Sequence, residues 1–143
     1  MQTQIDDVVW EEAMEFLTRI AGEGGYLFND DGSRRPVTYT DFIDALRDVY
    51  PFTLEDFYME DGIGSHFLAE LSEAEEDSGN GMITVLICSN RQRQLGGDLL
   101  PGPGFFRLAR RLGKFTQAES EMSFWLAEHR RVCVANGARE EDM

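Results

Sequence analysis

The sequence predicts a mostly helical α+β fold, and three observations point to it. Apolar residues recur at helical spacing in several segments. Residues that cap helices, mainly Thr, Ser and Asp, stand just before most of these segments. One apolar run, "MITVLICS" at residues 82–89, instead indicates a β-strand covered on both faces. Since 42% of the 143 residues are hydrophobic, we expect a single domain over residues 1–137, followed by an acidic, disordered tail at 138–143.

The first predicted helix begins at Asp6 or Asp7 as its N-cap. Its buried face is formed by Trp10, Ala13, Met14, Leu17 and Ala21. "GEGG" at residues 22–25 ends this helix, because glycine readily adopts the left-handed conformation of a C-cap. "YLF" at residues 26–28 then predicts a short strand, and "NDDGSRRP" at residues 29–36 predicts a turn.

Capping boxes, in which a Thr is followed three residues later by an acid, predict three further helix starts. The pairs are Thr38 with Asp41, Thr53 with Asp56, and Thr116 with Glu119. The first of these helices should end before Pro51 and bury Phe42, Ile43, Leu46 and Tyr50. Ser65 is expected to cap another helix over residues 66–77, and "DSGNG" at residues 77–81 predicts the turn that follows.

The C-terminal third contains two predicted helices. "PGPG" at residues 101–104 leads the chain into the first, whose apolar face is Phe105, Leu108, Ala109 and Leu112. Basic residues at positions i, i+3, i+4 and i+7 form a stripe on the opposite face: Arg107, Arg110, Arg111 and Lys114. The last helix follows Thr116 and ends at Asn136 and Gly137. Its predicted buried face is Met122, Trp125, Leu126, His129 and Cys133.

The sheet is expected to be small. Besides residues 82–89, "YLF" and "RPVTY" at residues 35–39 are the remaining strand candidates, so we expect two or three antiparallel strands. A short strand, a group of helices and a later strand with a basic loop form the outline of a winged-helix domain. The predicted fold is therefore α+β, mostly helical, with a winged-helix-like core and a small antiparallel sheet.

Four segments also carry a family resemblance: "TYTDFIDAL", "LSEAEEDSGNGMITVLICSN", "PGPGFFRLARRLG" and "FWLAEHRRV". In this order and spacing, over about residues 36–134, they resemble small, largely uncharacterised bacterial and phage proteins with a winged-helix-like core. The chain departs from that pattern at "RQRQLGGDLL", residues 91–100, which is longer than the family's turn. The resemblance implies the fold and carries no activity.

Charge is unevenly distributed along the chain, whose formal net charge is −14. Residues 1–80 contain 20 acidic and four basic residues, whereas residues 81–143 contain seven acidic and nine basic residues. Such a field steers binding partners without defining a fold. The sequence lacks an apolar run long enough to span a membrane, and its N-terminal segment is acidic where a signal peptide is basic. We therefore expect a cytoplasmic protein.

Two charged surfaces are candidate binding sites. Arg91 and Arg93, on the loop before the basic stripe, extend it into a partner- or anion-binding surface. The alternative is that these bases pair with the acidic half of the same chain or of a second copy. The acidic candidate surface is Glu73, Glu75, Glu76 and Asp77. Carboxylates at the end of a helix oppose its dipole, so helix stability alone does not explain them. A solvated face is the simpler interpretation, and a partner-binding acidic surface is the alternative.

Catalysis is not expected. His66 and His129 are the only histidines, and His129 falls on an apolar helix face, where a core histidine is the usual case. The sequence contains no nucleophile elbow and no zinc-binding motif, so no catalytic or metal-ligating residue can be assigned. "NDDG" at residues 29–32 lacks the spacing of a calcium loop. Cys88 and Cys133 are expected to be buried thiols, and no cofactor is predicted.

These observations predict a non-enzymatic acidic interaction or regulatory protein that binds a partner protein through charged surfaces. An inhibitor, an immunity-type protein or a phage-encoded accessory protein fits the size and charge. The first alternative is a DNA-binding winged-helix regulator that uses the Arg-rich loop and helix at residues 91–114, although the net charge opposes nucleic-acid binding. The second is an acidic mimic of DNA. A homo-oligomer remains an open alternative.

Overall fold

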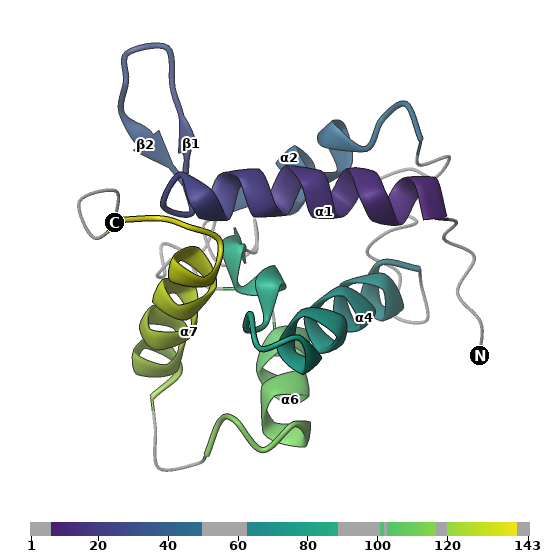
Figure 1. Ribbon diagram of the computed structural model, residues 1–143, viewed down its shortest axis with the longest axis vertical. Coiled ribbons are helices and arrows are strands. Elements are labelled where there is room, and N and C mark those ends of the chain that lie inside the picture. The colour runs from purple at the N-terminus through teal and green to yellow at the C-terminus, as the bar shows by residue number, and fades with distance from the viewer. Residues whose placement is uncertain (1–6, 50–62, 89–100, 102, 117–119, 140–143) are drawn as a thin grey trace.

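The computed structural model describes residues 7–49, 63–88, 101, 103–116 and 120–139 (Figure 1). Within these residues it contains five α-helices: α1 (Asp7–Gly22), α2 (Tyr39–Ala45), α4 (Ile63–Asp77), α6 (Pro103–Arg111) and α7 (Glu121–Ala135). A 3-10 helix, η1, spans Ile83–Leu86. The strands are β1 (Leu27–Phe28), β2 (Arg34–Arg35), β3 (Val37–Thr38) and β4 (Ile87–Cys88). The mostly helical α+β class is therefore confirmed.

The elements are arranged around η1. Figure 1 shows α1 crossing one side of the molecule, with α2 behind it and the β1–β2 hairpin projecting beyond its C-terminal end. Helices α4, α6 and α7 lie on the other side of α1, and η1 contacts α1, α4 and α7. The side chains of Ile83 and Val85 are fully buried there. The most apolar run of the sequence is therefore at the centre of the core.

The prediction of a long strand at residues 82–89 was wrong over most of its length. The chain forms η1 first and then the two-residue strand β4. Hydrogen bonds to side chains replace strand pairing, because the Thr84 N–H donates to Ser72 Oγ over 3.1 Å and the Met82 N–H donates to Glu128 Oε2 over 2.7 Å. Burial on both sides gives a short 3-10 helix the same apolar pattern as a buried strand.

The strands form two separate pairs. β1 and β2 are antiparallel, with Leu27 opposite Arg35 and Phe28 opposite Arg34, as expected for a hairpin. β3 and β4 are parallel, with Val37 opposite Ile87. The expectation that the strand predicted at residues 82–89 would pair in antiparallel fashion was therefore wrong. A parallel pair requires a long connection between its strands, and here that connection contains α2 and α4.

The N-terminal half follows the predicted pattern closely. Ala13, Leu17 and Ala21 are fully buried on α1. The turn after α1 contains Gly24 and Gly25, both with positive φ. At the start of α2, Thr38 and Asp41 form the predicted capping box.

Three predicted helix boundaries were wrong. Helix α2 ends at Ala45 and not at Tyr50, because tight turns follow, in which Leu46 N–H bonds to the Ile43 carbonyl. Helix α4 begins at Ile63, which places Ser65 inside its first turn. Helix α7 begins at Glu121, with Ser120 and not Thr116 as N-cap, because the Ser120 hydroxyl accepts from Ser123 N–H over 3.0 Å. Thr53, Asp56, Tyr50, Pro51 and Glu119 lie outside the described residues.

The buried face of α7 also differs from the prediction. It consists of Phe124, Glu128, His129, Val132 and Cys133. Leu126 is 55% exposed, so its predicted burial was wrong. The apolar pattern predicted the wrong residues for the buried face of α7, because this face includes a charged residue, Glu128. On α6, Phe105, Leu108 and Ala109 are buried as predicted, whereas Leu112 follows the end of the helix and is 37% exposed.

Two further features concern the C-terminal end of the chain and the character of the helices. Ala138, the first residue of the predicted tail, packs against the core, while residues 140–143 lie outside the described chain. None of the helices among the described residues is long and apolar enough to cross a membrane.

Candidate functional site

Four charged side chains from three parts of the chain meet beside η1, and we call them the charged junction. They are Glu76 on α4, Lys114 after α6, and Glu128 and Arg131 on α7. Lys114 Nζ donates to Glu76 Oε1 over 2.8 Å and also to Glu128 Oε2. Arg131 Nη1 lies 3.3 Å from Glu76 Oε1. The side chains of Lys114 and Glu128 are only 12% and 5% exposed, so this ion pair is largely removed from water.

The local sequence explains how Lys114 enters the junction. Helix α6 ends at Arg111, and Gly113 follows with a φ of +75°, which reverses the chain. The Lys114 N–H then donates to the Ala109 carbonyl over 2.9 Å. The next residue, Phe115, stacks on Phe124 of α7 with 5.0 Å between ring centroids. Lys114 is therefore held between α4 and α7 by a helix C-cap and an aromatic anchor.

The charged junction also fixes the entry into η1. Glu128 Oε2 accepts a hydrogen bond from the Met82 N–H, as described above. Gly81 precedes Met82 with a φ of +89°, and a β-carbon at this position would lie 2.9 Å from Val132 Cγ2. Only glycine accommodates both the backbone conformation and the close approach to α7. The junction thus connects α4, α6, η1 and α7.

The predicted basic stripe is shorter than expected. Arg107, Arg110 and Arg111 are exposed on α6, but Lys114 leaves the helix and is largely buried, so its predicted place on the stripe was wrong. Arg111 pairs with Glu73 of α4. The Arg110 guanidinium lies 4.7 Å from the centre of the Phe115 ring, a cation–π contact. Arg91 and Arg93 lie outside the described residues.

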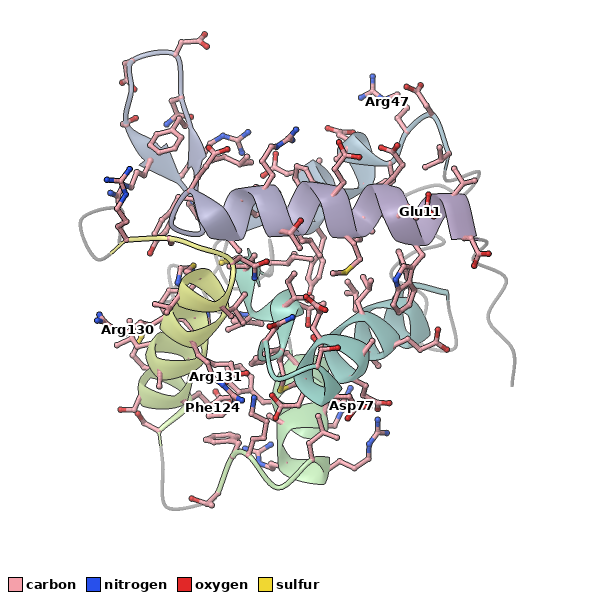
Figure 2. The ribbon with its side chains drawn as sticks, in the orientation of Figure 1. Glu11, Arg47, Asp77, Phe124, Arg130 and Arg131 are labelled. Carbon is pink, nitrogen blue, oxygen red and sulfur yellow. The ribbon has the colours of Figure 1, made fainter. Side chains whose placement is uncertain are left out.

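The predicted acidic surface faces this basic segment of the same chain. Glu73 pairs with Arg111, and Glu76 pairs with Lys114 and Arg131. Figure 2 shows Asp77 at the end of α4. Within the described residues, Asp77 and Glu75 take part in no ion pair. Two of the four predicted acidic residues thus already have basic partners inside the chain.

A second acidic surface, which the sequence analysis did not identify, lies on the outer face of α1. Its exposed carboxylates are Asp7, Glu11, Glu12 and Glu15, and we call them, with the 53% exposed Val8, the α1 ridge. Figure 2 shows Glu11 on this face. None of the four carboxylates forms an ion pair with any residue that the structure describes. Like charges at i and i+4, which disfavour a helix, were the sequence signal for this surface.

His129 lies in a buried aromatic cluster and not at an open site. Its ring centroid is 5.4 Å from that of Tyr26 and 4.9 Å from that of Trp125. Its Nδ1 is 3.8 Å from Cys133 Sγ. Burial lowers the pKa of His129, and burial also raises the pKa of Cys133 to about 11. Both groups are therefore neutral near pH 7, which is opposite to the charge state of a reactive thiolate–imidazolium pair.

Cys88 is buried as well, so both cysteines are buried thiols, as expected. Burial raises the pKa of Cys88 to about 12. Among the described residues, no group of three or more His, Cys, Asp or Glu side chains is arranged to hold a metal ion. Comparisons of the chain with protein-family models, with curated proteins and with solved structures gave no match.

Proposed function

We propose that this chain is a non-enzymatic, acidic interaction protein that uses the α1 ridge to bind a basic surface on a partner protein. The observation that carries the proposal is the set of exposed carboxylates on α1 that have no ion-pair partner among the described residues. Asp7 and Glu11, and Glu11 and Glu15, are like charges at i and i+4, which destabilise an isolated helix. A basic partner relieves this repulsion, so its binding is favoured at the ridge.

Ion pairing within the chain distinguishes the α1 ridge from the acidic residues of α4. Glu73 and Glu76 already interact with Arg111 and Lys114, and a partner that bound them would have to break those contacts. A partner that binds the ridge displaces only water and counterions from its exposed carboxylates. The ridge is therefore the better candidate for long-range attraction of a basic surface.

The same pairing favours this proposal over DNA binding. Of the predicted phosphate contacts on α6, Arg111 is paired with Glu73 and Arg110 lies against Phe115. A net charge of −14 also repels a duplex over about 8 Å at physiological salt. A winged-helix-like core remains part of the proposal, supported by the antiparallel hairpin that projects from the helical body.

The proposal is tested by titrating the purified chain with a short oligo-arginine peptide and measuring affinity by calorimetry at several salt concentrations. The ridge variant Glu11→Lys with Glu15→Lys is compared with Glu75→Lys and Asp77→Lys, which change the net charge equally on α4. We expect the ridge variant to weaken binding about tenfold more than the control variant. Equal weakening would show that net charge alone attracts the peptide, and the ridge would be rejected. Circular dichroism verifies the fold of each variant.

A further inference from the structure

Two Asn-Gly pairs in the sequence are candidate sites of spontaneous chemical modification, and their surroundings differ. They are Asn80–Gly81, in the turn between α4 and η1, and Asn136–Gly137, directly after α7. The side-chain carbonyl carbon of an asparagine is open to attack by the backbone nitrogen of the next residue. A following glycine favours this reaction, because it has no β-carbon to hinder the approach. Asparagine is therefore among the thermolabile residues of proteins.

The hydrogen bonds of the second pair oppose the reaction. Asn136 Nδ2 donates to the Val132 carbonyl over 2.9 Å, which holds the side-chain amide against the last turn of α7. The Gly137 N–H donates to the Val134 carbonyl over 3.0 Å, so the attacking nitrogen is engaged as well. Both hydrogen bonds have to break before Gly137 N can reach Asn136 Cγ, and the second pair is therefore protected.

The first pair lacks both of these restraints. Among the residues that the structure describes, no hydrogen bond engages the Asn80 side chain or the Gly81 N–H. Asn80 is held through its backbone instead, because its N–H donates to the Glu75 carbonyl over 2.9 Å. Asn80 is also partly exposed to solvent. Its side-chain amide is therefore free to turn towards Gly81 N while the turn itself stays in place.

We propose that Asn80 deamidates spontaneously in the folded chain, whereas Asn136 is protected. Gly81 N attacks Asn80 Cγ and forms an N–Cγ bond. The Cγ–Nδ2 bond then breaks, and Nδ2 leaves as ammonia with the proton of the Gly81 N–H. Water opens the resulting succinimide ring at either carbonyl. One opening gives aspartate, and the other gives isoaspartate, in which the main chain runs through the former side chain of residue 80.

Modification of this turn acts on the charged junction. Isoaspartate lengthens the main chain by a methylene group directly before Gly81, whose missing β-carbon would lie 2.9 Å from Val132 Cγ2. The next residue, Met82, donates its N–H to Glu128 Oε2 over 2.7 Å. A longer main chain must displace Gly81 from α7 or stretch this hydrogen bond. Both products also place a carboxylate beyond the C-terminal end of α4, where the helix dipole disfavours it. Deamidation therefore weakens the fold, and isoaspartate weakens it more than aspartate.

Peptide mapping of the aged chain tests the site. The purified chain is kept in neutral buffer or in urea, and trypsin then releases residues 48–91 and 132–139, which separate the two pairs. Mass spectrometry follows the loss of ammonia, and fragmentation assigns the modified residue. In buffer, Asn80 should deamidate at least about tenfold faster than Asn136, because two hydrogen bonds restrain the second pair. In urea the two rates should become similar. An Asn136 that reacts as fast as Asn80 in buffer, or an Asn80 that reacts only in urea, would overturn the proposal.

The products and their stability complete the test. A methyltransferase specific for isoaspartate should label the aged chain, and aspartate without isoaspartate would rule out the succinimide route. The isolated isoaspartate form should unfold at a lower urea concentration than the variant Asn80→Asp, which has the same charge and an ordinary main chain. Equal midpoints would reject the effect on the charged junction. The control variant, Asn80→Gln, should keep its mass at residue 80 and its urea midpoint during the same ageing.

Discussion

The backbone of Gly25 lies directly against the imidazole ring of His129. A β-carbon at Gly25 would be 2.3 Å from His129 Cε1 and 2.5 Å from Nε2, closer than atoms can approach without moving. The φ of Gly25 is +94°, a conformation that other residues rarely adopt. The turn after α1 therefore contacts α7 through a position where a side chain cannot fit.

Replacing Gly25 by Ala should destabilise the fold by about 3 kcal/mol or more, since it adds a steric overlap to the cost of a positive φ. Gly32→Ala is the matched control, because Gly32 also has a positive φ but no atom lies within 4 Å of its β-carbon position. That control should cost only about 1 kcal/mol. Urea unfolding measures both, and equal losses would show that the approach to His129 has no energetic consequence.

The buried His129 should make stability depend on pH. Burial lowers its pKa from the ordinary 6.5, so the unfolded chain binds more protons than the folded chain just below that pH. The free energy of unfolding should therefore fall as pH decreases through about 6.5, by at most about 1.4 kcal/mol per pH unit for this group. His129→Gln should flatten that dependence between about pH 7.5 and 5.5 in urea unfolding. An unchanged slope would contradict the prediction.

Removing the ammonium group from the charged junction should be costly. Lys114→Met leaves the buried carboxylate of Glu128 without its main counter-charge, and we expect a loss of about 3–5 kcal/mol. Adding Glu128→Gln removes that carboxylate's charge while retaining an acceptor for Met82 N–H, so the double variant should recover part of the loss. A double-mutant cycle measures the coupling, and additive effects would argue against an energetic link between the two residues.

The two thiols should be protected in the folded chain. Burial raises the pKa of Cys88 to about 12 and that of Cys133 to about 11, which leaves little thiolate to react at neutral or mildly alkaline pH. A disulfide reagent should label both cysteines slowly in buffer and rapidly in urea. Above the ordinary thiol pKa of 9.0, the unfolded chain ionises before the folded chain, so stability should fall as pH rises. Equal labelling rates in buffer and in urea would contradict the predicted protection of the thiols.

Local signals in the sequence predicted much of the fold. The apolar spacing on α1 and the capping box at Thr38 and Asp41 depend on near neighbours, and both were confirmed. The turn at residues 77–81 was also predicted correctly, because Gly79 and Gly81 adopt positive φ there. These features need no information about distant parts of the chain.

Two of the failures arose where a distant side chain determines the local structure. Residues 83–86 form a 3-10 helix because Ser72 and Glu128 hydrogen-bond the backbone around them, and neither residue is a neighbour in sequence. Lys114 completed a regular basic spacing, but its interactions are with Glu76 and Glu128 beyond the helix end. The pairing of Arg111 with Glu73 belonged to the alternative that the sequence left open. Charge counts alone could not assign partners across so many residues.

Lys114 is the only lysine in the sequence, and its position in the charged junction has a practical consequence for labelling. Acylating and cross-linking reagents that need access to the amine reach this side chain only when it separates from its two carboxylates. The rate at which Lys114 is acylated in native buffer therefore reports how often this side chain leaves Glu76 and Glu128. The labelling rate of a single residue thus measures local opening of the fold.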